Sequence, residues 1–458
     1  MKKSVETSLS ELLKMAAERG IRYRETLADH RVSPAPEALA RLSELGGALP
    51  EHPTAAETIL ALLDDIGSPA TVRMSGGRYF GFVNGSSLPA TLAANWLAGA
   101  WDQNCALAVM SPVAAELEEI ALGWLLELLQ LPAGSGGAFV TGATMANFSG
   151  LAAARHFVLE RAGWNVEADG LFGAPPITVV VGAEVHPTLL KALGLLGLGR
   201  ERVLTVPVDS QGRMRADAFP KLEGPAIVCI QAGNVNSGAF DPATELCDLA
   251  HQADAWVHVD GAFGLWAAVG GEYAHLAKGF AEADSWATDG HKWLNVPYDC
   301  GLAFVRYPEA LRATMAVTAA YMPTGEVREP MHYTPEASRR ARGVEVWAAL
   351  KSLGRSGLTE MIETACRHAA RFAEVLRQAG YEILNDVVLN QVLVSFGDAE
   401  TTQRVIAAIQ TDGTCWCGGT VWQGKTAMRI SVSSWATTEA DVERSLEAML
   451  RVAATQRG

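Results

Sequence analysis

Apolar residues in the middle of the chain form two kinds of segment that alternate. Short and almost continuous apolar runs, typical of strands buried on both faces, are followed by longer segments with the three- to four-residue spacing of helices. This alternation predicts an α/β fold with a mostly parallel, doubly wound sheet covered by helices on both faces. Five of the strands are expected at residues 177–182, 226–230, 255–259, 285–288 and 301–306.

The pattern changes towards both ends of the chain. Leu9–Arg22 and Pro36–Leu45 have amphipathic helical patterns interrupted by prolines, so residues 1–60 are expected to form a helical arm without a core of its own. Residues 61–325 are expected to form the large domain, since 458 residues exceed what one core usually supports. Residues 326–458 are expected to contain a mobile loop, a long helix and a small C-terminal α+β domain.

Two side chains with reactive groups follow apolar strands of the large domain. Asp260 ends one strand, and Lys292 follows the next one. Each residue alone is more often a turn residue or a surface charge. Ligands, however, bind at the C-terminal ends of strands in open parallel sheets. A lysine amine that forms a Schiff base and a carboxylate that holds a pyridinium nitrogen are the groups that pyridoxal phosphate (PLP) chemistry needs most, so the pair predicts a PLP site.

Two further segments fit the same site. Residues 139–155 run from an apolar strand through Gly142, Ala143 and Thr144 into a helix, whose free backbone N–H groups could bind a phosphate. An ordinary capped turn has the same pattern. His186 follows another strand, and its imidazole could either stack on a cofactor ring or cap the helix that begins there.

An ordered set of motifs resembles the group II PLP-dependent amino-acid decarboxylases, which include aromatic amino-acid, tyrosine, histidine and glutamate decarboxylases. The likeness covers nearly the whole chain and implies a fold-type-I PLP enzyme. It is specific for the family and much less so for a substrate. The motifs lie at Gly142 to Asn147, His186 with Lys191-Ala192, Gly233 with 238–242, His258-Val259-Asp260, and Asp289 to Leu294 with Asp299-Cys300.

The resemblance implies a role for each matching residue. Lys292 would carry the cofactor as a Schiff base, Asp260 would pair with its ring nitrogen, and His186 and Ala262 would pack against its two faces. The residues that would hold the phosphate are Gly142, Ala143, Thr144 and His291.

Three other positions bear on ligand contacts. Asn234 stands where many relatives have a threonine near the cofactor, so it is expected to replace that hydroxyl. Phe82 and Asn104 lie in two segments that resemble those lining the side-chain pocket of relatives. The second segment lacks the bulkier residues of relatives with aromatic substrates, which hints at a pocket less tailored to aromatic rings.

The resemblance implies decarboxylation of an L-amino acid to the amine and CO₂. The bond that breaks is the one held perpendicular to the cofactor ring, and the sequence does not display that orientation. An aminotransferase and a decarboxylating aldehyde synthase therefore stay open, as does a PLP-binding protein without catalysis. Arg429 could hold the substrate carboxylate in the ring plane, which would favour transamination, or it could make a structural contact.

Relatives carry a loop after the large domain that closes over the site and bears a tyrosine which protonates Cα. Tyr333 is expected to be this proton donor, with Tyr321 as the second candidate and a surface packing role as the alternative. The resemblance also implies a homodimer whose cleft borrows residues from the partner. Arg339, Arg340 and Arg342 follow the loop.

Composition narrows the setting. The net charge of −14 argues against nucleic acid or an anionic membrane as the main partner. No apolar run is long enough to span a bilayer, and the start lacks a signal-peptide pattern. Seven scattered cysteines favour reduced thiols in the cytoplasm. Cys415-Trp416-Cys417 has no second pair of ligands nearby, so no metal site is expected.

Overall fold

The computed structural model describes residues 7–317 and 327–456 of the chain. Its centre is a seven-stranded sheet, and every strand expected from the sequence is present. The strands are β1 (Gly136–Val140), β2 (Thr178–Gly182), β3 (Leu204–Val206), β4 (Ala226–Gln231), β5 (Trp256–Asp260), β6 (Ser285–Asp289) and β7 (Gly301–Val305).

The spatial order of this sheet is β1-β7-β6-β5-β4-β2-β3. Strands β2 to β6 pair in parallel, whereas β7 is antiparallel to both of its neighbours. The reason lies in the connection: residues 290–300 join β6 to β7 without a helix, and a parallel return needs a longer crossover. The expected mostly parallel α/β fold is confirmed.

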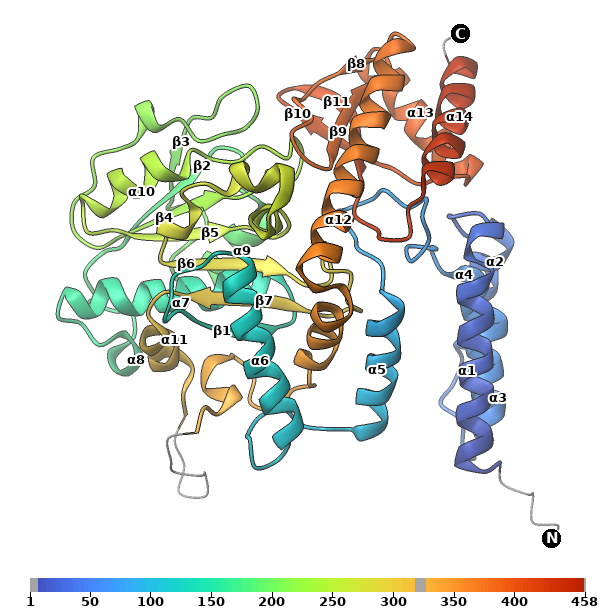
Figure 1. Ribbon diagram of the computed structural model, residues 1–458, viewed down its shortest axis with the longest axis horizontal. Helices are drawn as coiled ribbons and strands as arrows, with labels where there is room; N and C mark the ends of the chain where they lie inside the picture. Colours follow the sequence, from blue (N-terminus) through green and yellow to red (C-terminus); the bar gives the residue numbers. More distant parts are fainter. Residues whose placement is uncertain (1–6, 318–326, 457–458) are drawn as a thin grey trace.

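Helices cover the sheet on both faces, as Figure 1 shows. Alternate side chains of β4 enter two different hydrophobic cores: Val228 belongs to the core on the side of α10, and Ile227 belongs to the core on the side of α7. Complete burial of each such aliphatic side chain contributes about 1.5–3 kcal/mol. The helices of the large domain are α5 (Pro89–Trp101), α6 (Pro112–Leu128), α7 (Ala143–Arg161), α8 (Val166–Asp169), α9 (Pro187–Leu195), α10 (Ala243–His251), α11 (Pro308–Met315) and the first part of α12 (Gly343–Gln378).

The long helix α12 leads into the C-terminal part of the chain. It is interrupted at Gly354, whose φ of 60° lies in the region that favours glycine. Beyond it lies a four-stranded antiparallel sheet in the order β10-β11-β9-β8, covered by two helices. These elements are β8 (Glu382–Ile383), β9 (Gln391–Ser395), β10 (Gly418–Trp422), β11 (Lys425–Ser431), α13 (Ala399–Asp412) and α14 (Glu439–Thr455).

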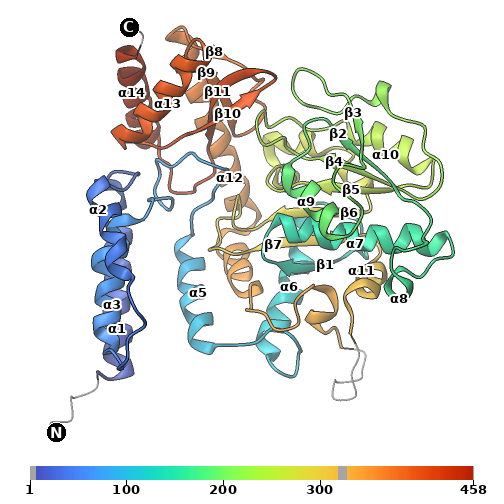
Figure 2. The same ribbon diagram turned by 180° about the vertical axis from the view of Figure 1, so that it is seen from behind.

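The N-terminal helices stand beside this body, as both views show (Figures 1 and 2). They are α1 (Leu9–Glu25), α2 (Pro36–Ala40), α3 (Ala56–Leu62) and the single turn α4 (Ser68–Ala70). Helix α1 begins with a capping box formed by Ser8 and Glu11, yet none of its residues is buried. Leu13 leaves 57% of its surface exposed. In the described ranges 7–317 and 327–456, no helix is both long and apolar enough to cross a membrane.

Candidate active site

A cavity of about 200 Å³ lies at the C-terminal ends of the parallel strands. Strands β5 and β6 end in Asp260 and Asp289, which both line it, and β4 ends in Gln231 on the same wall. The cavity brings together eight residues singled out from the sequence: Gly142, Ala143, Thr144, His186, Asp260, Ala262, His291 and Lys292.

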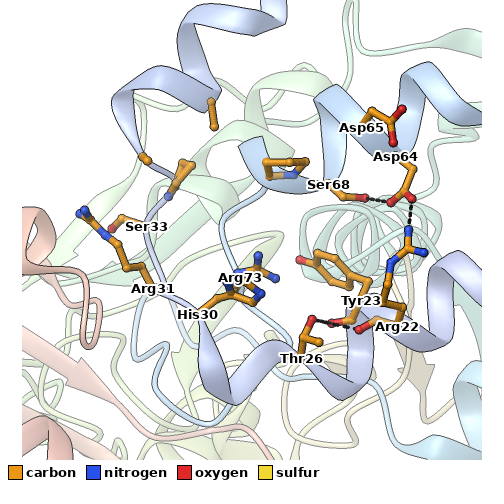
Figure 3. A pocket seen from close by; sticks show the side chains of 14 residues that line it. Arg22, Tyr23, Thr26, His30, Arg31, Ser33, Asp64, Asp65, Ser68 and Arg73 are labelled. Atoms are coloured by element: carbon orange, nitrogen blue, oxygen red, sulfur yellow. Dashed lines mark hydrogen bonds and ion pairs between the residues drawn. The ribbon is translucent and has the colours of Figure 1, made fainter.

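A larger cavity of about 590 Å³ lies in the N-terminal arm and shares no lining residue with the first one. Figure 3 shows its lining, in which the Asp64 carboxylate is already paired. Asp64 accepts hydrogen bonds from Ser68 and Arg19 and forms an ion pair with Arg22. This cavity is more open to solvent than the first, and no lysine lines it, so its size does not make it the reactive site.

Lys292 reaches the cavity from the segment after β6. Its Nζ lies 2.9 Å from Asp289 Oδ2, and about a fifth of its side chain is exposed. The buried Asn295 fixes this segment because its side-chain oxygen accepts from Ser86 N–H and its amide donates to the Ser433 carbonyl. Gly85 passes so close that an added Cβ would lie 1.9 Å from the Lys292 carbonyl. The amine is therefore held on a rigid backbone.

Asp289 is a site residue to which the sequence analysis assigned no role, although it opens the motif that ends in Lys292. Its Oδ1 accepts the Ala143 backbone N–H at 2.6 Å, while Oδ2 pairs with the lysine amine. The carboxylate is 2% exposed. One buried negative charge thus joins the start of α7 to the reactive amine.

Asp260 is buried at the end of β5, with 5% of its surface exposed. Its Oδ1 accepts the Ala262 N–H at 3.3 Å, and its Oδ2 accepts the Asn147 side-chain amide at 3.3 Å. The carboxylate and Ala262 both line the cavity. A planar ring placed there could therefore meet a carboxylate at its edge and a methyl group at its face.

His186 caps helix α9, which is one of the two uses expected for it, and it also lines the cavity, where its ring could stack on a cofactor. Its Nδ1 lies 2.6 Å from Thr188 Oγ1 and 3.3 Å from Thr188 N. Burial lowers the pKa of His186; the Asp260 carboxylate raises it by a smaller amount, and the nearby Lys292 lowers it further. A neutral imidazole can stack on an aromatic ring without adding a second positive charge beside the lysine.

The opposite end of the cavity is built from small residues. An added Cβ at Gly142 would lie 3.2 Å from the His291 ring, and one at Gly301 would lie 2.4 Å from Gly142 Cα. His291 Nδ1 accepts the Cys300 N–H, which leaves Nε2 for other partners, and burial lowers the pKa of His291. The start of α7 can therefore approach a phosphate closely.

Three predicted contact residues lie outside this lining. Asn234 is buried, but its Oδ1 accepts the Asn236 and Ser237 N–H groups of its own turn. Phe82 is 60% exposed and stacks on Trp416 at 5.4 Å. The structure brings neither residue into the cavity.

Asn104 is also outside the lining. Its amide donates to Ser338 Oγ at 3.2 Å, and its Oδ1 accepts the Arg339 N–H at 3.2 Å. Asn104 therefore fixes the segment that carries the three arginines. Arg339 forms a fully buried ion pair with Glu118 at 2.6 Å, and Arg342 pairs with Asp299 at 2.9 Å.

The two tyrosine candidates differ in what can be said of them. Tyr333 ends the short 3₁₀ helix Pro330–Tyr333 and lies under the Arg328 guanidinium, 4.4 Å from its ring centre. It is not part of the cavity lining. Tyr321 falls outside the described residues. Arg429 donates to the Val235 carbonyl at 3.2 Å and does not line the cavity either.

The lining residues fit PLP. They provide an amine for an aldehyde, a buried carboxylate for a ring nitrogen, a neutral imidazole for a ring face, and a cradle at Gly142 that a Cβ would fill. Within the ranges that the structure describes, no group of three or more His, Cys, Asp or Glu is placed to hold a metal ion.

Known proteins match this chain over most of its length. Residues 36–397 match the family described as the pyridoxal-dependent decarboxylase conserved domain. Tryptophan decarboxylase 1 of Oryza sativa subsp. japonica is 27% identical over 83% of this chain and 80% of its own. 4-Hydroxyphenylacetaldehyde synthase of Rhodiola rosea is 26% identical over 95% and 93%, and L-2,4-diaminobutyrate decarboxylase of Rhizobium meliloti is 28% identical over 78% and 72%.

Solved structures agree on the fold. The crystal structure of Oryza sativa TDC with PLP and tryptamine superposes with a TM-score of 0.90 at 22% identity and covers 100% of both chains. The family match spans far more than half of the chain, and the cavity has the groups that the cofactor requires. The chain belongs to the pyridoxal-dependent decarboxylase family and is a PLP-dependent carboxy-lyase.

Proposed function

We propose that this enzyme removes the α-carboxylate of an L-amino acid and releases the corresponding amine and CO₂. The observation that supports this most directly is that Lys292, Asp260 and His186 line one cavity at the ends of parallel strands. The chain's relatives are named as decarboxylases of several different amino acids, so the amino-acid class is proposed rather than one substrate.

Each cavity residue is given a role in this proposal. Lys292 would hold the aldehyde carbon of the cofactor through Nζ and would give it up to the amine of the substrate. Asp260 would hold the ring nitrogen, and His186 and Ala262 would hold the two ring faces. Bound PLP supplies an electron-accepting ring that stabilises negative charge at the substrate Cα.

The phosphate end of the site keeps the cofactor in register. The start of α7 at Gly142, Ala143 and Thr144, together with His291 Nε2, supplies hydrogen-bond donors for the phosphate. The Ala143 N–H and Lys292 Nζ are both held by Asp289. Cofactor binding would therefore release the Ala143 N–H and Lys292 Nζ from Asp289 for the phosphate and the aldehyde carbon.

We propose a homodimer as the active form. Besides Leu13 in the arm, α5 exposes Trp96 and Leu97 by 45% and 51%, and Val109 is 71% exposed. Such apolar surface on a folded chain is typical of a subunit interface. Phe82 is exposed, Asn104 is half-buried, and neither lines this chain's own cavity, so their proposed substrate contacts are made across the dimer. Asn234 is proposed to act indirectly: its side chain holds the turn whose neighbouring residues Gly233 and Val235 line the cavity.

The proton returned to Cα is assigned to Tyr333, with Tyr321 as the alternative donor. Loss of this proton donor would leave negative charge at Cα open to oxygen, which yields an aldehyde. The similarity to 4-hydroxyphenylacetaldehyde synthase over 95% of the chain makes aldehyde formation the second candidate activity. Transamination is less well supported, because Arg429 is occupied by the Val235 carbonyl.

The experiment is an assay of CO₂, free amine, aldehyde and hydrogen peroxide over a panel of L-amino acids, with PLP present. We expect CO₂ and amine in equal amounts for at least one substrate, and no turnover by Lys292→Ala. The matched control is Lys221→Ala, which removes an exposed lysine paired with Glu223. Multiple turnover by Lys292→Ala would contradict the role of Lys292, and equal aldehyde and peroxide would favour the second activity.

We also propose a reducing, cytoplasmic setting for the enzyme. All seven cysteines lie in the described part of the chain, and each is a buried free thiol. Burial raises the pKa of Cys105 and of Cys247 to about 12, which keeps both in the unreactive thiol form. Thiol titration of native and unfolded protein tests this: we expect reactive thiols only after unfolding.

A further inference from the structure

A row of buried polar side chains lies next to Asp260 and has no part in the roles given above. It consists of Asn147, His258, Ser285 and Trp256, which are at most 1% exposed. None of the four is among the residues that line the cavity. Four buried polar groups in one row are costly unless each finds a partner, so their arrangement calls for an explanation.

Every member of the row is hydrogen-bonded to the next. Trp256 Nε1 lies 2.8 Å from Ser285 Oγ, which lies 2.7 Å from His258 Nδ1. His258 Nε2 lies 2.8 Å from Asn147 Oδ1, and Asn147 Nδ2 lies 3.3 Å from Asp260 Oδ2. The row therefore begins at an indole and ends at the carboxylate of the site.

The carboxylate end and a neutral imidazole fix the direction of the hydrogen bonds. A carboxylate oxygen accepts, so the Asn147 amide N–H donates to Asp260 and Asn147 Oδ1 accepts from His258 Nε2. His258 therefore carries its proton on Nε2, its Nδ1 accepts from the Ser285 hydroxyl, and the Trp256 indole donates to the Ser285 oxygen. Burial lowers the pKa of His258 to about 3, so the imidazole is neutral and has one donor and one acceptor.

The row fits between the β5–β6 pair and helix α7 because residue 150 of that helix is a glycine. His258 and Ser285 face each other across the β5–β6 pair and lie under helix α7. An added Cβ at Gly150 of α7 would lie 2.8 Å from the His258 ring. Glycine at position 150 therefore lets the helix pack onto the ring without displacing it.

We propose that Asn147 and His258 are positioning residues for Asp260: the one-way row of hydrogen bonds holds Oδ2 and so orients the carboxylate, which leaves Oδ1, beside its Ala262 N–H contact, able to accept from the cofactor's ring nitrogen. This rests on the role proposed for Asp260. Aligned hydrogen bonds polarise one another, so each one strengthens the donor that reaches the carboxylate. Without the row, the carboxylate would be less firmly oriented towards the ring nitrogen, and the protonated form of that nitrogen would be less favoured.

Other ionisable groups also face Asp260 and must stay constant in any test. His186 and Cys229 interact with its charge, and Lys292 and Asp289 line the same cavity. The variants below change none of these residues. A change in the protonation of the ring nitrogen can then be assigned to the row.

The test compares His258→Leu, which removes both hydrogen bonds of the ring, with His258→Gln, whose amide N–H can still donate to Asn147. The holoenzymes are prepared with ¹⁵N-labelled PLP, and the ring-nitrogen chemical shift and the PLP dissociation constant are measured. For His258→Leu we expect the shift to move towards the unprotonated value and the dissociation constant to rise about tenfold. For His258→Gln we expect a ring-nitrogen shift like that of the parent and a PLP dissociation constant within about threefold of the parent value.

Ser149→Ala is the matched control. Ser149 lies on the same helix as Asn147, is fully buried and donates only to the Met145 carbonyl. We expect an unchanged ring-nitrogen shift for Ser149→Ala, and a smaller change for Ser285→Ala than for His258→Leu because Ser285 is farther from the carboxylate. If His258→Leu does not fold, Ser285→Ala and Gly150→Ala decide the question.

The outcomes separate this proposal from the one on which it rests. A parent-like ring-nitrogen shift in folded His258→Leu, or in Ser285→Ala and Gly150→Ala together, would overturn the positioning role. Asp260→Asn tests the carboxylate itself. If Asp260→Asn also leaves the shift unchanged, the role of Asp260 fails as well; if only Asp260→Asn changes it, the carboxylate acts without the row.

Discussion

The cofactor cavity and the N-terminal arm differ in how far one chain completes them. Around the cavity, Asp289 and Asp260 each have a partner for both carboxylate oxygens, and the backbone that carries Lys292 is tied down by Asn295. In the arm, α1 has a capped start and a salt-bridged side but buries no residue. The cavity owes its shape to its own core, whereas the arm needs a surface that a second copy could supply.

This difference has a consequence for mutations. A substitution in the cavity should change chemistry and leave assembly intact, because the groups there already satisfy each other. A substitution on the apolar side of the arm should change assembly first and activity only through it. The predictions below separate these two kinds of effect.

The largest expected effect is at Asp260. Asp260→Asn is expected to bind PLP but to lose activity by about 10²-fold or more, since a neutral amide supports a protonated ring nitrogen poorly. Its subunit association should equal that of the parent. The measurements are steady-state decarboxylation, bound PLP by absorbance, and sedimentation velocity. Near-normal turnover by folded Asp260→Asn would remove Asp260 from its proposed role.

The next effect concerns the arm. Leu9→Asp/Leu13→Asp places two charges on side chains that are 72% and 57% exposed in this chain. If these side chains pack against a partner, the dimer dissociation constant should rise about tenfold or more, because the buried apolar contact is replaced by a buried charge. Lys14→Asp, at an exposed polar position of the same turn, is the control.

Sedimentation over a range of protein concentrations measures this effect, with activity measured in the same samples. Activity should follow the fraction of dimer, and the double variant should recover activity at high concentration. An active monomer of the parent enzyme at working concentration would contradict the proposed dimer. A double variant that dimerises like the parent would show that this side of α1 has no partner.

A smaller effect is expected at Tyr333. Tyr333→Phe should lower the amine yield a few-fold, leave PLP binding intact and shift product towards aldehyde, since the donor of the Cα proton is lost. Product ratios by chromatography and peroxide release provide the measurement, and Tyr321→Phe is run beside it. The contact of Tyr333 with Arg328 predicts little loss of stability, because the ring is retained. A parent-like product ratio transfers the role to Tyr321.

Much of the fold could be predicted from the sequence. Strand β4 is almost wholly apolar and fully buried, which is typical of a sheet covered on both faces. Strands β3, β8 and β10 were missed, because β3 and β8 have only three and two residues and β10 is partly exposed at an edge. The reversed direction of β7 depends on the length of its connection, which a strand pattern alone does not show.

The site residues that could be predicted are those whose reactive side chains follow apolar strands in the sequence. Lys292, Asp260 and His186 follow strand ends, and the structure places them around one cavity. Asp289 received no role, because nothing in the pattern shows that its carboxylate spans from α7 to the lysine. The hydrogen bond from the Asn236 N–H to the Asn234 side chain could not be predicted either, because it depends on the local backbone geometry of the turn.

The smallest predicted effect lies at the N-terminal end of β6, away from the cavity at the C-terminal ends of the strands. This region belongs neither to the cavity nor to the arm. His251 Nε2 lies 3.1 Å from Asp284 Oδ2, and this hydrogen bond raises the pKa of His251 in the folded chain. His251 therefore binds its proton more tightly in the folded chain than in the unfolded chain. Its contribution to stability is fully present below its ordinary pKa of about 6.5 and is lost as the pH rises through the folded value.

His251→Gln should unfold at a lower temperature than the parent at pH 5.5, by less than about 2 °C because the pair is partly exposed, and this difference should disappear by pH 8.5. Differential scanning calorimetry at the two pH values measures this, with His52→Gln in an exposed loop as the control. If the difference in unfolding temperature between His251→Gln and the parent is equal at both pH values, or larger at pH 8.5, the charge on His251 contributes nothing to the stability of the fold.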